Sequence, residues 1–308
     1  MADTTNTYSS LTNEQKTYFE RKLLSRLLPN LVFAKYGQKK SMPKNEGDKI
    51  NFRRFNSLAA ATTPLTEGVT PDGAALDITK VEAQVAQYGN FVRITDKLDM
   101  VGLDPVLSET AGLLGENAAL VLDTVVRDEV CAGTSVQYAG ARASRDAITA
   151  SDVVTAAEIK KAVRTLRRNN AKPIDGKYFV GIIDPDVAYD LMNDALWQDV
   201  SKYNGGTAIM AGEVGRLGGV RFIETTNTKT AENTGKIAVH MSMIIGKDAY
   251  GVVDVEGSSK PEMIVKALGS AGTDDPLNQR ASSGWKCMFT CKRLQELAMV
   301  RIESSVTA

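Results

Sequence analysis

The chain has few of the residues that metal and redox chemistry require. Its 308 residues include a single histidine, His240, and three cysteines, Cys131, Cys287 and Cys291. One histidine excludes a multi-histidine metal site and leaves any imidazole-based catalysis to one side chain. A sparse, odd set of cysteines is typical of a reducing compartment and does not fit a disulfide framework. We therefore expect no metal and no cofactor.

Net charge and long apolar runs are also absent. Lys plus Arg and Asp plus Glu each total 37, so the formal net charge is zero and no overall field draws the chain to nucleic acid or an anionic membrane. No apolar stretch approaches the roughly 18 residues of a membrane span. The first residues, MADTTNTYSSLTNEQK, lack the basic and apolar regions of a signal peptide. We expect a soluble protein made in the cytoplasm, without a membrane partner.

The familiar catalytic motifs are missing as well. The stretch GEVGRLGGVRFIETTN, residues 212–227, looks at first like a phosphate cradle. A dinucleotide fingerprint, however, needs its glycines to follow a strand and to open a helix, and here a β-branched run follows them. No Gly-Lys pair is followed by Ser or Thr, and neither G-x-S-x-G nor H-E-x-x-H occurs. The glycines are better explained as a loop and turn that lead into a strand.

Three isolated features have structural explanations that we favour over functional ones. His240 lies in the apolar run KIAVHMSMIIG, which favours a packed position on a strand over a catalytic base. The pair Asp274-Asp275 has no further carboxylates at suitable spacing, so a loop cap or turn is favoured over a divalent-cation site. Cys287 and Cys291 are four residues apart, which places both on one face of a strand.

Helical and β-type patterns alternate along the rest of the chain. The strongest helix signal begins at Asp104-Pro105, an N-cap followed by a first-turn proline, and ends near Cys131. A second helix begins at the capping box Thr155 to Glu158 and ends at Arg168, and a third follows Asp184-Pro185 to about Lys202. The apolar stripe of the first helix consists of Leu107, Ala111, Leu114, Ala118, Val121 and Val125. Strand patterns occur at 48–55, 177–184, 219–225, 236–245, 249–255, 262–268, 284–294 and 296–304, which makes an α+β protein.

Two segments offer little for a core of their own. After a helical pattern that Pro29 ends or kinks, residues 35–54 carry seven basic side chains against two acidic ones. This segment is either a solvated arm or a strap on an acidic partner or nucleic acid. Residues 56–80 form a turn-rich excursion between two strands with almost no large apolar side chains. The pair Tyr88-Gly89 interrupts the following alternation and predicts a bulge or bend.

The order of these parts resembles that of the major capsid proteins of tailed bacteriophages over nearly the whole chain. TEGVTPDG (66–73) followed by YGNFVRITDKL (88–98) is similar to an extended loop and its return strand. GSAGTDDPLNQRASSGWK (269–286) is similar to a C-terminal signature. GRLGGVRFIET (215–225) is similar to a strand and turn of the domain at capsomer centres. The resemblance implies an N-terminal helix and arm (1–48), an extended β-hairpin loop (49–96), a peripheral domain with a long spine helix (97–172 and 253–286) and an axial domain (173–252 and 287–308).

The resemblance also implies a function without catalysis. Copies would assemble as pentamers and hexamers into an icosahedral shell around double-stranded DNA, made in the host bacterial cytoplasm and located in the virion capsid. Partners would be neighbouring capsomers, DNA bound non-specifically, and scaffolding, portal or decoration proteins. Alternatives are a nucleotide-binding or hydrolytic enzyme and another phage structural protein, such as a tail tube or decoration protein. The candidate inter-subunit residues are Lys39, Lys40, Arg53, Arg54, Thr66, Glu67, Gly68, Pro71, Tyr88, Gly89, Asp275, Gln279 and Trp285.

Overall fold

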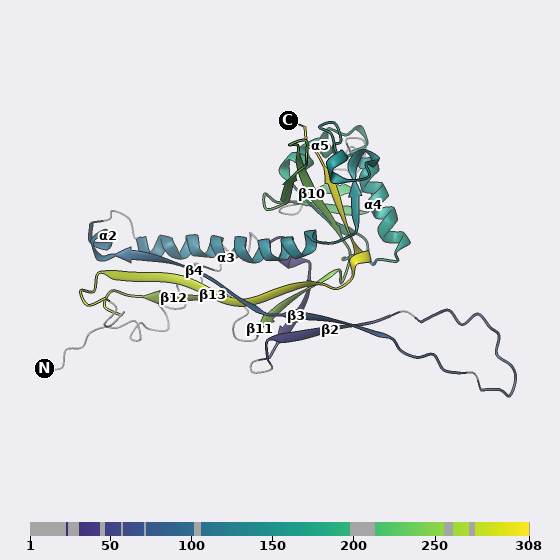
Figure 1. Ribbon diagram of the computed structural model, residues 1–308, viewed down its shortest axis with the longest axis horizontal. Coiled ribbons are helices and arrows are strands. Elements are labelled where there is room, and N and C mark those ends of the chain that lie inside the picture. Colours follow the sequence, from purple (N-terminus) through teal and green to yellow (C-terminus); the bar gives the residue numbers. More distant parts are fainter. Residues whose placement is uncertain are drawn as a thin grey trace.

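The molecule consists of an elongated body, a compact lobe at one end of it and a long loop that projects from the same end (Figure 1). The structure, a computed structural model, describes residues 23, 31–43, 47–56, 58–70, 72–101, 106–197, 213–255, 261–270 and 275–307. The expected N-terminal helix, apart from Leu23, and the Asp104-Pro105 cap lie outside these residues. Among the described helices, none is long and apolar enough to cross a membrane.

The elongated body is built around one long strand. Five strands make its sheet: β1 (Gln38–Met42), β4 (Ala86–Thr95), β11 (Tyr250–Val255), β12 (Glu262–Lys266) and β13 (Arg280–Arg293). β13 pairs antiparallel with β4 along one side and with β12 and β11 along the other, and β1 adds in parallel to β11. The short helix α2 (Asp96–Val101) follows β4 at the far end of the body (Figure 1).

The long helix α3 (Val106–Cys131) lies along this sheet (Figure 1). Its 26 residues span about 39 Å at the usual rise of about 1.5 Å per residue, as the sequence predicted. The buried face differs from the predicted stripe in the second half, where Leu122 and Val126 are buried and Val121 and Val125 are only half-buried. Steps of three and four average 3.5 residues, so a straight helix drifts away from such a stripe by about 20° per heptad.

The compact lobe has a second sheet with two helices on one face. Its strands are β5 (Val136–Tyr138), β6 (Phe179–Ile183), β7 (Glu213–Leu217), β8 (Val220–Glu224), β9 (Lys229–Glu232), β10 (Ala238–Ile245) and β14 (Met299–Ser304), in the order β5-β14-β10-β6-β8-β7 with β9 on β10. The helices are α4 (Ala156–Arg168) and α5 (Pro185–Asn193), and both pack their apolar side chains against this sheet. The other face of the sheet packs on α3, which makes the core continuous between lobe and body.

The helix caps of the lobe agree with the sequence. The Thr155 hydroxyl accepts a hydrogen bond from the Glu158 N–H (3.4 Å), and the Asp184 carboxylate accepts one from the Asp186 N–H (3.2 Å). α5 ends at Asn193, and residues 195–197 are helical again after a break at Asp194. Residues 198–202, the rest of the predicted helix, lie outside the described residues.

The glycine cluster forms a β-hairpin and no phosphate site. β7 and β8 pair antiparallel around a turn at Gly218 and Gly219, whose φ angles are 62° and 92°. Two consecutive positive φ angles are easily reached only by glycine. The cluster is followed by a strand and not by a helix N-terminus, which confirms the prediction and removes the motif that suggested a nucleotide-binding enzyme.

Two of the segment boundaries drawn on the sequence fall inside strands. The boundary expected at 286/287 lies inside β13, and the one expected at 252/253 lies inside β11. β4, which was assigned to the extended loop, pairs with β13 over ten residues and belongs to the body. Backbone hydrogen bonds bind each strand to its sheet along its whole length. The chain passes between body and lobe three times among the described residues, at 132–135, 246–249 and 294–298.

The expected bend at Tyr88-Gly89 was wrong, because both residues pair regularly with β13. The strand is interrupted three residues earlier, at Val85, whose N–H donates to the carbonyl of Asp48 (2.9 Å). Gly89 serves close packing instead, since a Cβ at this position would lie 2.7 Å from the carbonyl oxygen of Trp285.

Candidate functional site

An extended loop, residues 56–77, joins the two strands of a ribbon. The ribbon strands β2 (Lys49–Phe55) and β3 (Ile78–Gln84) pair antiparallel. Their base is anchored in a small core, where Ile50, Phe52 and Ala83 pack against Met42 and Val253 of the body. The extended loop itself continues far beyond the body (Figure 1). The sequence predicted this arrangement of two strands and an excursion, and the structure confirms it.

The extended loop buries almost nothing within its own chain. All of its described residues from 58 to 77 are exposed, and the turn at its tip is closed by a hydrogen bond from the Val69 N–H to the Thr66 carbonyl (3.2 Å). Gly68 in this turn has a φ of 75°, whereas Pro71 lies outside the described residues. The large apolar side chains of the loop are between 55% and 76% exposed: Leu58, Leu65, Val69 and Leu76. Exposed apolar side chains arranged along one segment mark a surface for association.

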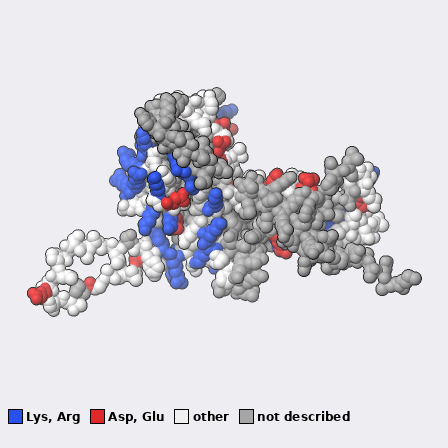
Figure 2. Space-filling view, turned by 180° about the vertical axis from the view of Figure 1, so that it is seen from behind, with Lys and Arg blue, Asp and Glu red and all other residues white. Residues whose placement is uncertain are grey.

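The charge of the extended loop is of one sign. Between residues 56 and 77 the sequence contains Glu67, Asp72 and Asp77 and no Lys or Arg. Figure 2 shows acidic side chains at the far end of the loop, while Lys and Arg gather on the compact lobe and where the loop leaves the body. The surface of the extended loop therefore combines exposed apolar side chains with a net negative charge.

A groove of about 560 Å³ lies on the sheet of the body. In it, Ile264 of β12, Gly284 of β13 and Phe91 of β4 form one cross-strand row. The alternate residues of β13, including Trp285 and Cys287, belong to the core that packs on α3. Because successive side chains of a strand point to opposite faces, the groove lies on the face of the sheet turned away from α3.

Glycine makes the groove hollow, and cations surround it. A Cβ at Gly284 would lie 2.7 Å from the Cβ of Phe91, so a larger residue does not fit between the strands. Lys266 and Arg93 are exposed in the next cross-strand row, and Lys286 is half-buried on the other side. The Arg93 guanidinium lies 5.4 Å from the centre of the Phe91 ring, a cation–π arrangement. Sequence reasoning missed this groove, because its residues come from three separate strands.

Two predicted interface residues are buried within the chain. Trp285 is 2% exposed, and its indole N–H donates to Oδ1 of Asn117 on α3 (3.1 Å). The buried carboxylate of Asp275 accepts a hydrogen bond from the Arg280 N–H (2.7 Å), which is the turn cap that the sequence favoured. The backbone carbonyl of Gln279 accepts from the Asp96 N–H (3.0 Å). Within the chain, Asp275 and Trp285 therefore hold β13 in position.

The basic segment 35–54 is not a free arm. Lys39 and Lys40 lie exposed on β1, the edge strand of the sheet of the body, and the Lys40 ammonium donates to the carbonyl of Asn51 (2.6 Å). Arg53 and Arg54 lie exposed on the ribbon strand β2. Parallel pairing of β1 with β11 supplies backbone hydrogen bonds that composition does not reveal, although four of the five residues of β1 remain exposed.

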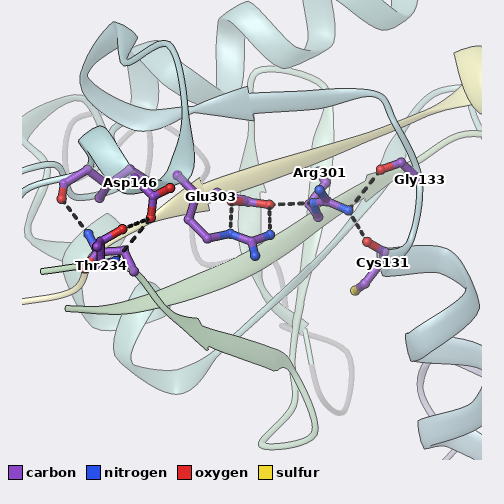
Figure 3. Close-up of polar contacts among 9 residues, drawn as sticks. Cys131, Gly133, Asp146, Thr234, Arg301 and Glu303 are labelled. Carbon is purple, nitrogen blue, oxygen red and sulfur yellow. Dashed lines mark hydrogen bonds and ion pairs between the residues drawn. The ribbon is translucent and has the colours of Figure 1, made fainter. Parts of the chain in front are cut away.

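A buried ionic network joins the lobe to the end of α3 (Figure 3). The Glu303 carboxylate on β14 is fully buried and accepts two hydrogen bonds from Arg145 (2.7 Å each) and one from Arg301 (2.8 Å). Arg301 in turn donates to the backbone carbonyls of Cys131 and Gly133, where α3 ends. Cations at a helix C-terminus satisfy its free carbonyls. The network fixes the compact lobe relative to the long helix.

The chain matches the model of a family of phage capsid proteins over residues 78–302, well over half of its length. It belongs to this family. The match covers the return strand of the ribbon, all of the described body except β1 and the residues around it, and nearly all of the compact lobe. The chain is thus a structural protein of the virion capsid, consistent with the absence of catalytic motifs, and the capsid fold expected from the resemblance is confirmed.

Solved phage capsids share the fold at low sequence identity. The capsid of Ralstonia phage GP4 has a TM-score of 0.70 and 13% identity, covering 89% of this chain and 88% of that one. The capsid of cyanophage Pam1 has a TM-score of 0.64 and 17% identity over the full length of both chains. The capsid of cyanophage P-SCSP1u has a TM-score of 0.65 and 16% identity, covering 90% and 88%. No curated protein matches the chain.

Proposed function

We propose that this capsid protein is the major subunit of an icosahedral shell of pentamers and hexamers that encloses double-stranded DNA. The observation that carries the proposal is the extended loop, whose described residues are all exposed in a single copy. Rings of subunits form through heterologous contacts, in which one surface of a copy meets a different surface of the next. A projecting loop and a separate groove provide two such surfaces.

In the proposed shell, the extended loop of one copy covers the groove of its neighbour. The loop carries apolar side chains and only negative charge, and the groove combines Ile264 and Phe91 with the cations Lys266 and Arg93. Complementary charge favours the correct partner and opposes loop-to-loop contact. Thr66, Glu67, Gly68 and Pro71 at the tip, together with Tyr88 and Gly89 of β4, are the proposed interface residues near this contact. Lys39, Lys40, Arg53 and Arg54 contribute at the base of the ribbon.

A charge exchange tests this contact. Glu67→Lys and Lys266→Glu should each raise the protein concentration needed for assembly by about tenfold or more, because like charges then face each other. The combined variant should recover assembly, whereas Glu232→Lys, a charge reversal at an exposed site on the lobe, should leave it unchanged. Negative-stain electron microscopy and sedimentation measure the assembled fraction. Single variants that assemble normally would contradict the contact, and tubes instead of polyhedral shells would contradict the icosahedral function.

DNA is the proposed non-specific partner of the shell interior. α4 presents exposed cations at Lys160, Arg164, Arg167 and Arg168 on the side away from its core face. Backbone phosphates bind such a row without reading sequence, and the affinity falls steeply with salt. Replacing Arg164 and Arg167 by Glu should lower the salt dependence of duplex binding by the unassembled chain, in which α4 is accessible to added DNA. Binding with an unchanged salt dependence would exclude this helix. Scaffolding, portal and decoration proteins, met in the bacterial cytoplasm, complete the proposed set of partners.

A further inference from the structure

Three buried polar side chains on the lobe have atoms without a hydrogen-bond partner among the described residues. They are Nδ1 of His240 and the hydroxyls of Ser242 and Ser304. His240 is 8% exposed, and the two serines are at most 1% exposed. His240 and Ser304 are direct partners across β10 and β14, and Ser242 follows two residues along β10. All three side chains therefore share the sheet face that α4 and α5 cover. Buried polar atoms without a partner are rare in folded proteins, and a bound water or ion is a common reason for them.

Two carboxylates lie next to the imidazole. Ligand atoms of Asp184, Asp186 and His240 are all within 4.8 Å of one another, and His240 Nδ1 is 3.7 Å from Asp184 Oδ2. Asp184 is fixed at the N-cap of α5, and the hydroxyl of buried Thr228 donates to its Oδ2. The lone pair of a neutral imidazole nitrogen accepts either a proton or a metal ion. Nδ1 has no hydrogen-bond donor in reach among the described groups, so its lone pair is available to an ion.

We propose that Asp184, Asp186 and His240 bind a divalent transition-metal ion. One imidazole and two carboxylates are a donor set that suits Zn²⁺ and its first-row neighbours, whereas Mg²⁺ and Ca²⁺ prefer oxygen alone. Two ligand atoms about 2.1 Å from a tetrahedral ion are about 3.4 Å apart, so the observed 3.7 Å needs only a small rotation of either side chain. The sequence did not suggest a metal, because the rest of α5, the β7–β8 hairpin and β9 separate Asp186 from His240 along the chain.

The site ties together three parts of the lobe. Asp184 and Asp186 begin α5, His240 lies on the central strand β10, and Thr228 ends the segment that follows β8. In that segment, Asn227 donates to Asp123 of α3 (3.2 Å) and accepts from Arg127 (2.8 Å). A bound ion would hold α5 and this segment on β10, beside the contact between the lobe and the long helix. Its role is to stabilise the lobe, independently of the contact between loop and groove.

Titration of the full-length chain tests the site. After treatment with a chelator, ZnCl₂ should bind with one ion per chain in calorimetry and raise the thermal midpoint. His240→Gln and Asp186→Asn should each weaken binding by more than the ~10–100-fold that loss of an outer-shell partner costs. Asp186 is exposed, so its variant should fold normally. Asp248→Asn is the matched control, because it removes an exposed carboxylate of the β10–β11 turn and should bind as the unaltered chain does.

Cobalt distinguishes this site from the cysteines. Co²⁺ bound to His240 and carboxylates should give d–d absorption without thiolate charge-transfer bands, and the His240→Gln variant should lose that absorption. Three results would each overturn the proposal: no Zn²⁺ binding by the unaltered chain, a thiolate spectrum with Co²⁺, or undiminished binding in both ligand variants. None of these results depends on shell assembly, which is measured separately on the same samples by electron microscopy.

Discussion

The extended loop and the long helix α3 are segments of similar length with opposite relations to the rest of the chain. α3 buries one face against both sheets, whereas the described residues of the loop from 58 to 77 are all exposed. Ordering a residue costs about 1–2 kcal/mol of backbone entropy, which α3 recovers by packing within its own chain. The loop has no such compensation in a single copy. We conclude that the helix stabilises the subunit and that the loop acts between subunits.

Deleting residues 60–75 should give the largest separation between these two roles. Shell formation should be lost, because the surface that meets the neighbour is removed, while circular dichroism should show an unchanged thermal midpoint for the lone chain. Local regions with few buried contacts contribute little to global stability. A midpoint that falls together with assembly would show that the loop supports its own subunit.

Glu303→Ala should have the largest effect on the fold itself. Removing one partner of a buried ion pair costs about 3–5 kcal/mol, because the remaining charge stays buried. Here the largely buried Arg301, which contacts the end of α3, would lose its carboxylate, and the partly exposed Arg145 would lose its partner as well. Denaturant unfolding measures the change, with the exposed Glu232→Ala as control. A loss below about 1 kcal/mol, the range of exposed pairs, would show that the network is not what joins the lobe to the helix.

Two neighbouring leucines of α3 test which face of this helix is buried. Leu114 is 2% exposed and Leu113 is 60% exposed. Leu114→Ala should cost about 2–5 kcal/mol of unfolding free energy, because it leaves a cavity in the core. Leu113→Ala should change the unfolding free energy by at most about 0.5 kcal/mol. Similar values for both variants would contradict the assignment of the buried face.

Acid should weaken the lobe through Asp152. Its carboxylate accepts hydrogen bonds from Arg142 (2.8 Å) and from the N–H and hydroxyl of Thr149 (2.7 and 2.8 Å). The Arg142 guanidinium and these bonds lower the pKa of Asp152 to about 2. A depressed folded-state pKa contributes stability that is present above the unfolded value of about 3.9 and is lost as the pH falls toward 2. Asp152→Asn should therefore flatten stability between about pH 4 and 2, measured by denaturant unfolding, and an unchanged profile would contradict this.

Local signals predicted most of the fold. The cap at Thr155, the apolar steps of α3 and the alternation of residues 49–55 each specify an element within a few turns of chain, and the structure has those elements. Pairing between distant strands was not predictable. The composition around Lys39 and Lys40 predicted a charged arm. In the structure they lie on β1, which pairs with the edge of β11, a strand more than two hundred residues later in the sequence.

Only part of the candidate site was predictable from the sequence. The loop was predictable from its composition, because a segment without large apolar clusters cannot form a core. The groove, the Glu303 network and the ligands around His240 were not, since each joins residues of different elements that lie far apart in the sequence. The contact of Trp285 was not predictable either: its motif suggested an interface between copies, and within the chain its indole N–H donates to Asn117 of α3.

Hydrogen exchange on the lone chain and on assembled shells tests the central claim most directly. Amides of 58–77 should exchange rapidly in the lone chain and become protected in the shell, whereas amides of α3 between 110 and 130 should be protected in both. Protection of the loop in the lone chain, or rapid exchange of the loop in intact shells, would contradict the assignment of this segment to contacts between copies.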